Sequence, residues 1–236
     1  MASRRKGVPL IWLAGDPDDL GPRLEMGCAG IVTNTVVLRQ LCEKYGTAEN
    51  LARAYCAITD LPVVMEIDGE TTEELMEAAD EFLKIGPQIA IKIPMTGHGM
   101  RAVRRLADRG VETMTTTVFS ASQAAAAAQA GTTHALIFCE PMLAQGADPF
   151  QLIREVREMF SNWEGAPYVT AALVRTRSTA EHALRAGAEG VIIFDSVFDE
   201  MLEHPSTTEW NETFRDKWEE MRHHNQIEYL KSPAKV

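Results

Sequence analysis

One lysine lies inside an apolar stretch that has the composition of a β-strand. The segment Ile89–Thr96 reads Ile-Ala-Ile-Lys-Ile-Pro-Met-Thr, and the lysine is Lys92. Successive side chains of a strand alternate between its faces, so Ala90 and Lys92 share one face and the isoleucines share the other. Burial disfavours the ammonium form of a lysine, and the neutral amine is a nucleophile for aldehydes and ketones. The pattern predicts a Schiff-base lysine; the alternative is a structural lysine whose ammonium group reaches solvent at the strand end.

Three other strand-like segments also end in polar residues. Asn34 ends the second such segment, Glu66 the third and Thr116 the fifth. If these segments are parallel strands of one barrel, the four polar side chains converge at its C-terminal face, where active sites of that fold lie. There Glu66 can act as an acid or base, Thr116 can hold a water molecule, and Asn34 can bind substrate hydroxyls. A threonine in a strand is also explained by β propensity alone. The prediction of a site therefore depends on all four polar residues lying at the same depth in the barrel.

Eight strand-like segments alternate with amphipathic stretches along the chain. They are Pro9–Ala14, Gly30–Asn34, Pro62–Ile67, Ile89–Ile93, Val111–Thr117, Thr133–Phe138, Tyr168–Ala172 and Gly190–Phe194. Such alternation implies a parallel sheet covered by helices, and eight strands in 236 residues favour an α/β fold closed as a (β/α)8 TIM barrel. No Gly-x-Gly-x-x-Gly motif follows the first segment, which disfavours a dinucleotide-binding fold.

Helix boundaries are marked by capping residues and glycines. Gly110, Gly131 and Gly187 stand where a helix must end in a left-handed residue before the next strand. We expect one domain over residues 1–236 with an extra C-terminal helix at about 206–225. Its large apolar side chains are Trp210, Phe214, Trp218 and Met221. Their spacing gives the helix an apolar face, which either packs on its own barrel or on a neighbouring subunit.

Charge and cysteine content limit the classes of partner. The formal net charge is −11, and nucleic acids and anionic membranes require a concentrated positive surface, so neither partner is expected. The four cysteines form no Cys-x-x-Cys pair, so neither a zinc site nor a disulfide framework is indicated. We expect a cytoplasmic protein that uses no metal or cofactor and takes a small-molecule carbonyl substrate, phosphorylated or carboxylated substrates included.

Several of these blocks together resemble the transaldolases. The blocks are Gly30–Asn34, Ile91–Thr96 and Thr116–Ala124, and the resemblance runs over about residues 8–220. It is closest to the short subfamily that includes fructose-6-phosphate aldolase. The resemblance implies that Lys92 forms the Schiff base and that Glu66 and Thr116 hold the catalytic water. It also places Asn34 at a substrate-binding position and implies rings of five subunits, often decamers.

The chain departs from the family pattern at positions that recognise or cleave sugar phosphates. Ala14 replaces an aspartate that handles a substrate hydroxyl proton, and Phe138 stands where fructose-6-phosphate aldolase has a tyrosine. Pro141 replaces a phosphate-binding arginine, and Leu173 a phosphate-contacting serine. Asp16 replaces the lost aspartate only if its turn bends inward.

These departures leave three functions open. The first is a class I transaldolase or aldolase with Lys92, Glu66 and Thr116 as catalytic residues. In it, Thr33, Asn34, Phe138 and Arg175 contact the substrate. The second is another lysine-dependent condensation in specialised metabolism, and the third is a non-catalytic ligand-binding relative.

Overall fold

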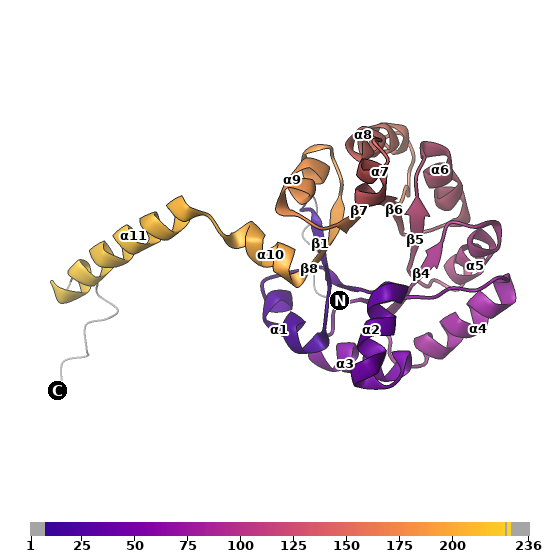
Figure 1. The fold of residues 1–236 in the computed structure, drawn as a ribbon, viewed down its shortest axis with the longest axis horizontal. Helices are drawn as coiled ribbons and strands as arrows, with labels where there is room; N and C mark the ends of the chain where they lie inside the picture. The colour runs from indigo at the N-terminus through magenta and orange to yellow at the C-terminus, as the bar shows by residue number, and fades with distance from the viewer. Residues whose placement is uncertain (1–7, 225, 228–236) are drawn as a thin grey trace. The chain divides into compact units, whose positions relative to one another are not determined.

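Parallel strands close into a barrel in the computed structural model, which describes residues 8–224, 226 and 227 (Figure 1). The strands are β1 (Leu10–Ala14), β2 (Gly30–Val32), β3 (Val63–Glu66), β4 (Ile89–Pro94), β5 (Thr113–Val118), β6 (His134–Phe138), β7 (Tyr168–Val174) and β8 (Gly190–Phe194). Each strand pairs with its sequence neighbours, and β8 pairs with β1. The (β/α)8 TIM barrel expected from the sequence is therefore confirmed.

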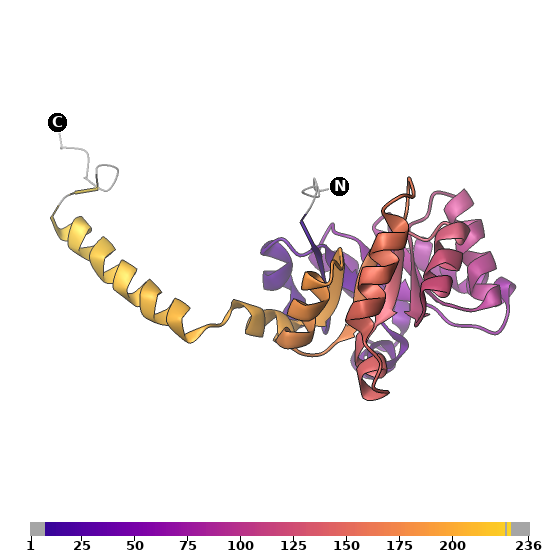
Figure 2. The same ribbon diagram turned by 90° about the horizontal axis from the view of Figure 1, so that it is seen from above.

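Helices surround this barrel and run alongside its strands (Figures 1 and 2). They are α1 (Pro17–Glu25), α2 (Thr35–Tyr45), α3 (Ala48–Ile58), α4 (Thr72–Leu83), α5 (Gly97–Asp108), α6 (Ala121–Ala130), α7 (Cys139–Ala144), α8 (Pro149–Phe160) and α9 (Arg177–Arg185). Two of the strand connections hold two helices instead of one: α2 and α3 follow β2, and α7 and α8 follow β6. The sequence patterns indicated α8, with Asp148 at its start, but they did not indicate α2, α3 or α7.

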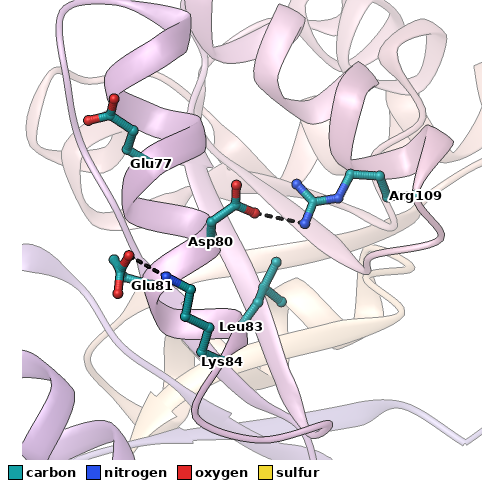
Figure 3. Close-up of a pocket in the computed structure, with 6 residues that line it drawn as sticks. All are labelled: Glu77, Asp80, Glu81, Leu83, Lys84 and Arg109. Atoms are coloured by element: carbon teal, nitrogen blue, oxygen red, sulfur yellow. Dashed lines mark hydrogen bonds and ion pairs between the residues drawn. The ribbon is translucent and has the colours of Figure 1, made fainter.

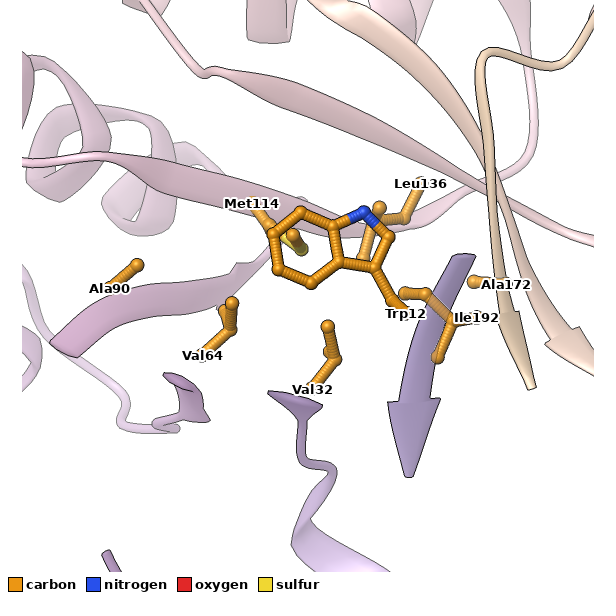
Figure 4. Close-up of a cluster of buried hydrophobic side chains, with 8 residues drawn as sticks. All are labelled: Trp12, Val32, Val64, Ala90, Met114, Leu136, Ala172 and Ile192. Atoms are coloured by element: carbon orange, nitrogen blue, oxygen red, sulfur yellow. The ribbon is translucent and has the colours of Figure 1, made fainter. Parts of the chain in front are cut away.

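The barrel interior is closed by one layer of apolar side chains from all eight strands (Figure 4). The layer consists of Trp12, Val32, Val64, Ala90, Met114, Leu136, Ala172 and Ile192. Trp12 is the largest of them and is only 1% exposed. Because inward positions recur every two residues, the next inward position on each strand lies toward the C-terminal end of the barrel.

The described residues beyond Phe198 belong to a second compact unit, which begins at Asp199. Helix α10 (Asp195–Leu202) leads into it, and α11 (Pro205–His223) is its longest element. The C-terminal helix expected at about 206–225 is thus present, except that residue 225 lies outside the described part of the chain. No helix in the described part is both long and apolar enough to span a bilayer.

The strand ends lie within two residues of those expected from the sequence, and two of the differences are informative. The three glycines expected after helices, Gly110, Gly131 and Gly187, all have positive φ angles, at 73°, 93° and 99°. The second strand, however, ends at Val32 and not at Asn34, because the Asn34 side chain begins helix α2. The seventh strand continues past the expected Ala172 to Val174.

Candidate active site

The lysine expected to face the barrel axis does so. Ala90, two residues before it on β4, belongs to the interior layer, and Lys92 is only 5% exposed. Its Nζ lies 2.9 Å from the carbonyl oxygen of Thr33 and 3.1 Å from Oε2 of Glu66. Desolvation lowers the pKa of Lys92 below its usual 10.5, and the carboxylate of Glu66 opposes part of that effect. Lys92 is thus a buried amine with a lowered pKa beside a carboxylate.

Glu66 is held by three neighbouring groups. Glu66 is paired with Lys92 in the register of β3 and β4, which explains why their side chains meet. Its Oε2 also accepts a hydrogen bond of 3.2 Å from the Thr35 amide, and its own amide donates to Thr33 Oγ1 at 2.9 Å. These bonds hold the carboxylate at the end of its strand. The Thr35 amide and the β3–β4 register together keep it within 3.1 Å of the Lys92 amine.

Thr33, directly after β2, forms hydrogen bonds with both Lys92 and Glu66. Its hydroxyl donates to the Val64 carbonyl at 3.0 Å, and its carbonyl accepts from Lys92. The residue is 1% exposed, so its hydroxyl and carbonyl are both engaged inside the protein. This geometry supports a role in holding Lys92 and Glu66, a role that the sequence pattern did not reveal.

Thr116 lies on β5, the strand next to Lys92. It is two residues beyond Met114 of the interior layer and is fully buried. Its Oγ1 makes no hydrogen bond within the described part of the chain. Buried hydroxyls are nearly always paired, and an exception calls for a water molecule, a ligand or strain to explain it. The position and chemistry of this hydroxyl fit a group that binds a small polar molecule near Lys92.

Asn34 differs from its expected place at a strand end. It is the N-cap of α2, and its Oδ1 accepts a hydrogen bond of 2.9 Å from the Val37 amide. An asparagine is among the best N-cap residues because its side chain satisfies a free helix N–H group. The cap fixes the side chain with Oδ1 toward the helix, which leaves the amide nitrogen as its remaining donor.

The first strand offers no carboxylate to this site. Ala14 stands two residues beyond Trp12 and is 3% exposed. Asp16 caps α1 and accepts hydrogen bonds from Lys44 Nζ at 2.8 Å and from Tyr45 Oη at 2.6 Å. Its carboxylate is therefore committed to the α1–α2 surface, and the inward turn that would let it replace the missing aspartate is not present.

Phe138 and Arg175 stand at the ends of β6 and β7. Phe138 is half-buried, packs against the interior layer, and meets Phe119 edge to face with ring centroids 5.5 Å apart. Arg175 is exposed directly after β7, and no ion pair joins it to another described residue. Phe138 thus forms an apolar wall, and Arg175 is an available cation at the same end of the barrel.

A surface hollow elsewhere does not compete with this site (Figure 3). It is lined by residues at the C-terminal halves of α4 and α5, and those helix ends lie at the opposite end of the barrel from the strand ends. Its charges pair among themselves: Lys84 binds Glu81, and Arg109 binds Asp80 at 2.7 Å. Within the described part of the chain, no group of three His, Cys, Asp or Glu residues could hold a metal ion.

The closed barrel with a buried lysine and carboxylate at its C-terminal end defines an enzyme scaffold of the TIM-barrel class. Residues 36–232 match the model of the family described as transaldolase/fructose-6-phosphate aldolase. The chain belongs to this family and is a transaldolase- or aldolase-like enzyme.

Curated relatives agree with this assignment. The chain is 32% identical over 189 residues to a probable transaldolase of Streptococcus equi subsp. zooepidemicus (strain MGCS10565). It is 31% identical over the same length to a probable transaldolase of Streptococcus pyogenes serotype M5 (strain Manfredo). Each match covers 80% of this chain and 87% of the relative.

Proposed function

We propose that the enzyme makes or breaks a carbon–carbon bond in a ketose or related hydroxyketone through a Schiff base on Lys92. The observation that carries this proposal is the buried Lys92 amine, 3.1 Å from the Glu66 carboxylate, at the C-terminal end of the barrel. Desolvation, which lowers the pKa of Lys92, raises the fraction of neutral amine that can attack a carbonyl carbon. The family and the names of the relatives support the same reaction class.

The reaction begins when the neutral Lys92 amine adds to the carbonyl carbon and gives a carbinolamine. Loss of water, with a proton supplied to the departing hydroxyl, forms the iminium ion. This cation accepts the electron pair of the adjacent C–C bond when a base removes the proton of the β-hydroxyl group, which releases an aldehyde and leaves an enamine. Protonation of the enamine, or its addition to another aldehyde, regenerates an iminium ion, and hydrolysis then frees Lys92.

Glu66 is the proposed acid and base for these proton transfers. Its carboxylate is held by the Thr35 amide beside Lys92, where it can take up the proton that the amine loses. The unpaired Thr116 hydroxyl supports a second part of the proposal, in which Thr116 and Glu66 together hold the water that enters and leaves the carbinolamine. The remaining Asn34 donor and the Arg175 guanidinium are the proposed contacts to substrate hydroxyls or a substrate anion.

A different lysine-dependent condensation is the second candidate. Ala14 favours this candidate, because it leaves the first strand without the aspartate that acts as a base in C–C cleavage. Schiff-base formation does not need that aspartate. Both candidates share the covalent step on Lys92, and they differ in whether an aldehyde product is released.

The covalent step is tested by trapping it. We expect incubation with dihydroxyacetone, fructose or other keto compounds, followed by borohydride, to give a reduced adduct on the peptide that contains Lys92, detected by mass spectrometry. Release of an aldehyde from the untreated reaction separates C–C cleavage from another condensation. Absence of an adduct with every keto compound tested would refute a Schiff-base mechanism of either kind.

We further propose that α11 joins copies of this chain into a homo-oligomer. The apolar face expected from the sequence is exposed: Trp210 is 57% exposed, Phe214 62% and Trp218 43%. The rings of Trp210 and Phe214 contact each other with centroids 5.4 Å apart and planes tilted by 40°, so they form one aromatic patch on the helix. Exposed aromatic stripes of this kind mark protein interfaces, and pentamers or decamers are the assemblies that family resemblance implies.

We expect Phe214→Asp to dissociate this assembly. An aromatic anchor at the centre of an interface contributes about 2 kcal/mol or more, so self-association weakens by roughly 30-fold. Sedimentation equilibrium measures the change, and Glu212→Ser, two positions away on the opposite side of the helix, is the matched control. A monomer in the unmodified protein, or an oligomer unaffected by Phe214→Asp, would exclude this role for α11.

A further inference from the structure

A carboxylate lies in the connection after β6, at the same end of the barrel as Lys92. Glu140 lies in α7, two residues after Phe138, and is half-buried. Its Oε1 accepts a hydrogen bond of 3.1 Å from the hydroxyl of Thr179. Thr179 is the third residue of α9, the helix that follows β7. The connections after β6 and β7 are therefore joined at this point by the Glu140 carboxylate.

The first turn of α9 is a position with a known preference for anions. Helix N-termini carry free N–H groups and a positive partial charge, and barrels of this class often bind a substrate phosphate at loops after the seventh and eighth strands. Here the Glu140 carboxylate lies at the first turn of α9, where it accepts from the Thr179 hydroxyl, while the Thr179 amide donates to Thr176 Oγ1. A phosphate brought to the same turn would lie beside the Glu140 carboxylate and be repelled by it.

The same carboxylate suits a substrate hydroxyl. An ionised carboxylate accepts several hydrogen bonds, and Thr179 uses only one of the oxygens of Glu140. Arg175, directly after β7, offers donors on the same part of the rim. β6 and β7 stand two and three strands around the barrel from β4, and their connections follow strand ends at the same end of the barrel as Lys92.

We propose that Glu140 is a specificity-determining residue that selects substrates whose remote end carries hydroxyl groups and no phosphate. The inference rests on the proposed Schiff base at Lys92, which fixes the carbonyl end of the substrate. The negative charge of Glu140 excludes phosphorylated ketoses by repulsion. Specificity requires such a group, which disfavours the wrong ligand, as well as groups that bind the right one.

Fructose and fructose 6-phosphate are the matched probes, since the second carries the phosphate remote from the carbonyl. Their open-chain fractions differ, but that difference is the same for every variant and cancels when the variants are compared. The measured quantity is the ratio of their rates of borohydride-trapped adduct formation on Lys92 at equal concentration. We expect the unmodified enzyme to favour fructose, and Glu140→Gln to shift the ratio toward fructose 6-phosphate by about tenfold or more. Glutamine keeps an acceptor for Thr179 and removes only the charge. Glu181→Gln, an equal change of charge at an exposed position of α9, is expected to leave the ratio unchanged.

Binding of inorganic phosphate, measured by calorimetry, tests Glu140 without any reaction at Lys92. We expect Glu140→Gln to bind phosphate at least about tenfold more tightly than the unmodified protein and Glu181→Gln to match the unmodified protein. Gain of phosphate binding without any adduct would overturn the proposed function and leave the role of Glu140 supported. Equal phosphate affinity in all three proteins, with an unchanged ratio of trapped ketoses, would overturn the role of Glu140.

Discussion

Lys92→Met is expected to abolish the borohydride-trapped adduct and to lower turnover by roughly 10⁴- to 10⁶-fold, the range seen when an enzyme loses its covalent nucleophile or the base that activates it. Methionine keeps most of the volume of the buried side chain but has no amine to attack a carbonyl group. Mass spectrometry of the reduced peptide and a turnover assay measure the two effects.

The control for this variant must separate lost chemistry from lost structure. Lys84→Met removes a lysine of the outer surface that pairs with Glu81, and we expect it to retain both adduct and turnover. Lys92→Met also leaves the Glu66 carboxylate without its partner cation, so circular dichroism and a thermal melt of both variants are compared. An adduct that persists in folded Lys92→Met would place the nucleophile at another lysine.

The sequence predicts the barrel because its local signals agree with one another. Strand-like segments, capped helices and left-handed glycines recur in the same order, and the register that they imply is found at Ala90 and Lys92. Alternation alone was sufficient to place Lys92 inside, since a residue two positions from a core alanine shares its face. The expected convergence of Lys92 and Glu66 followed from another rule, namely that the C-terminal ends of parallel barrel strands meet at one face.

Other features depend on contacts or backbone angles that local patterns do not encode. Thr117 and Leu173 have φ angles of 59° and 51°, values that non-glycine residues rarely adopt, and both lie where the strand register shifts. Such bulges alter the direction of a strand end without a sequence signal. The contact of Glu140 with Thr179 joins residues 39 apart, so only the tertiary structure could reveal it.

Asn34 shows how one residue satisfies two demands. Its position after β2 suggested a strand end, and its residue type is equally typical of a helix N-cap. The cap is the arrangement observed, and it orients the side chain by a bond to the Val37 amide. The Oδ1 atom of Asn34 therefore caps the helix, and its amide nitrogen is left for the proposed contact with substrate.

Glu66→Gln is expected to lower turnover by about 10²- to 10⁴-fold while the trapped adduct on Lys92 still forms, because this is the usual contribution of a general acid or base. Glutamine preserves an acceptor for the Thr35 amide and removes the charge. Loss of turnover with retention of the adduct would therefore assign to Glu66 the proton transfers and to Lys92 the covalent step.

The pH dependence of trapping gives an independent measure of the same contact. The amine must be neutral to react, so the rate of adduct formation rises with pH through the pKa of Lys92, which desolvation places below 10.5, and then levels off. The negative charge of Glu66 stabilises the ammonium form and raises this pKa, so its removal moves the midpoint of the profile to lower pH.

Glu70→Gln, at an exposed position in the same connection between β3 and α4, is expected to leave the profile unchanged. A midpoint that stays fixed in Glu66→Gln would mean that the carboxylate does not act on Lys92 in solution. A lowered midpoint with undiminished turnover would mean that Glu66 only raises the pKa of Lys92. Another group would then have to carry out the proton transfers.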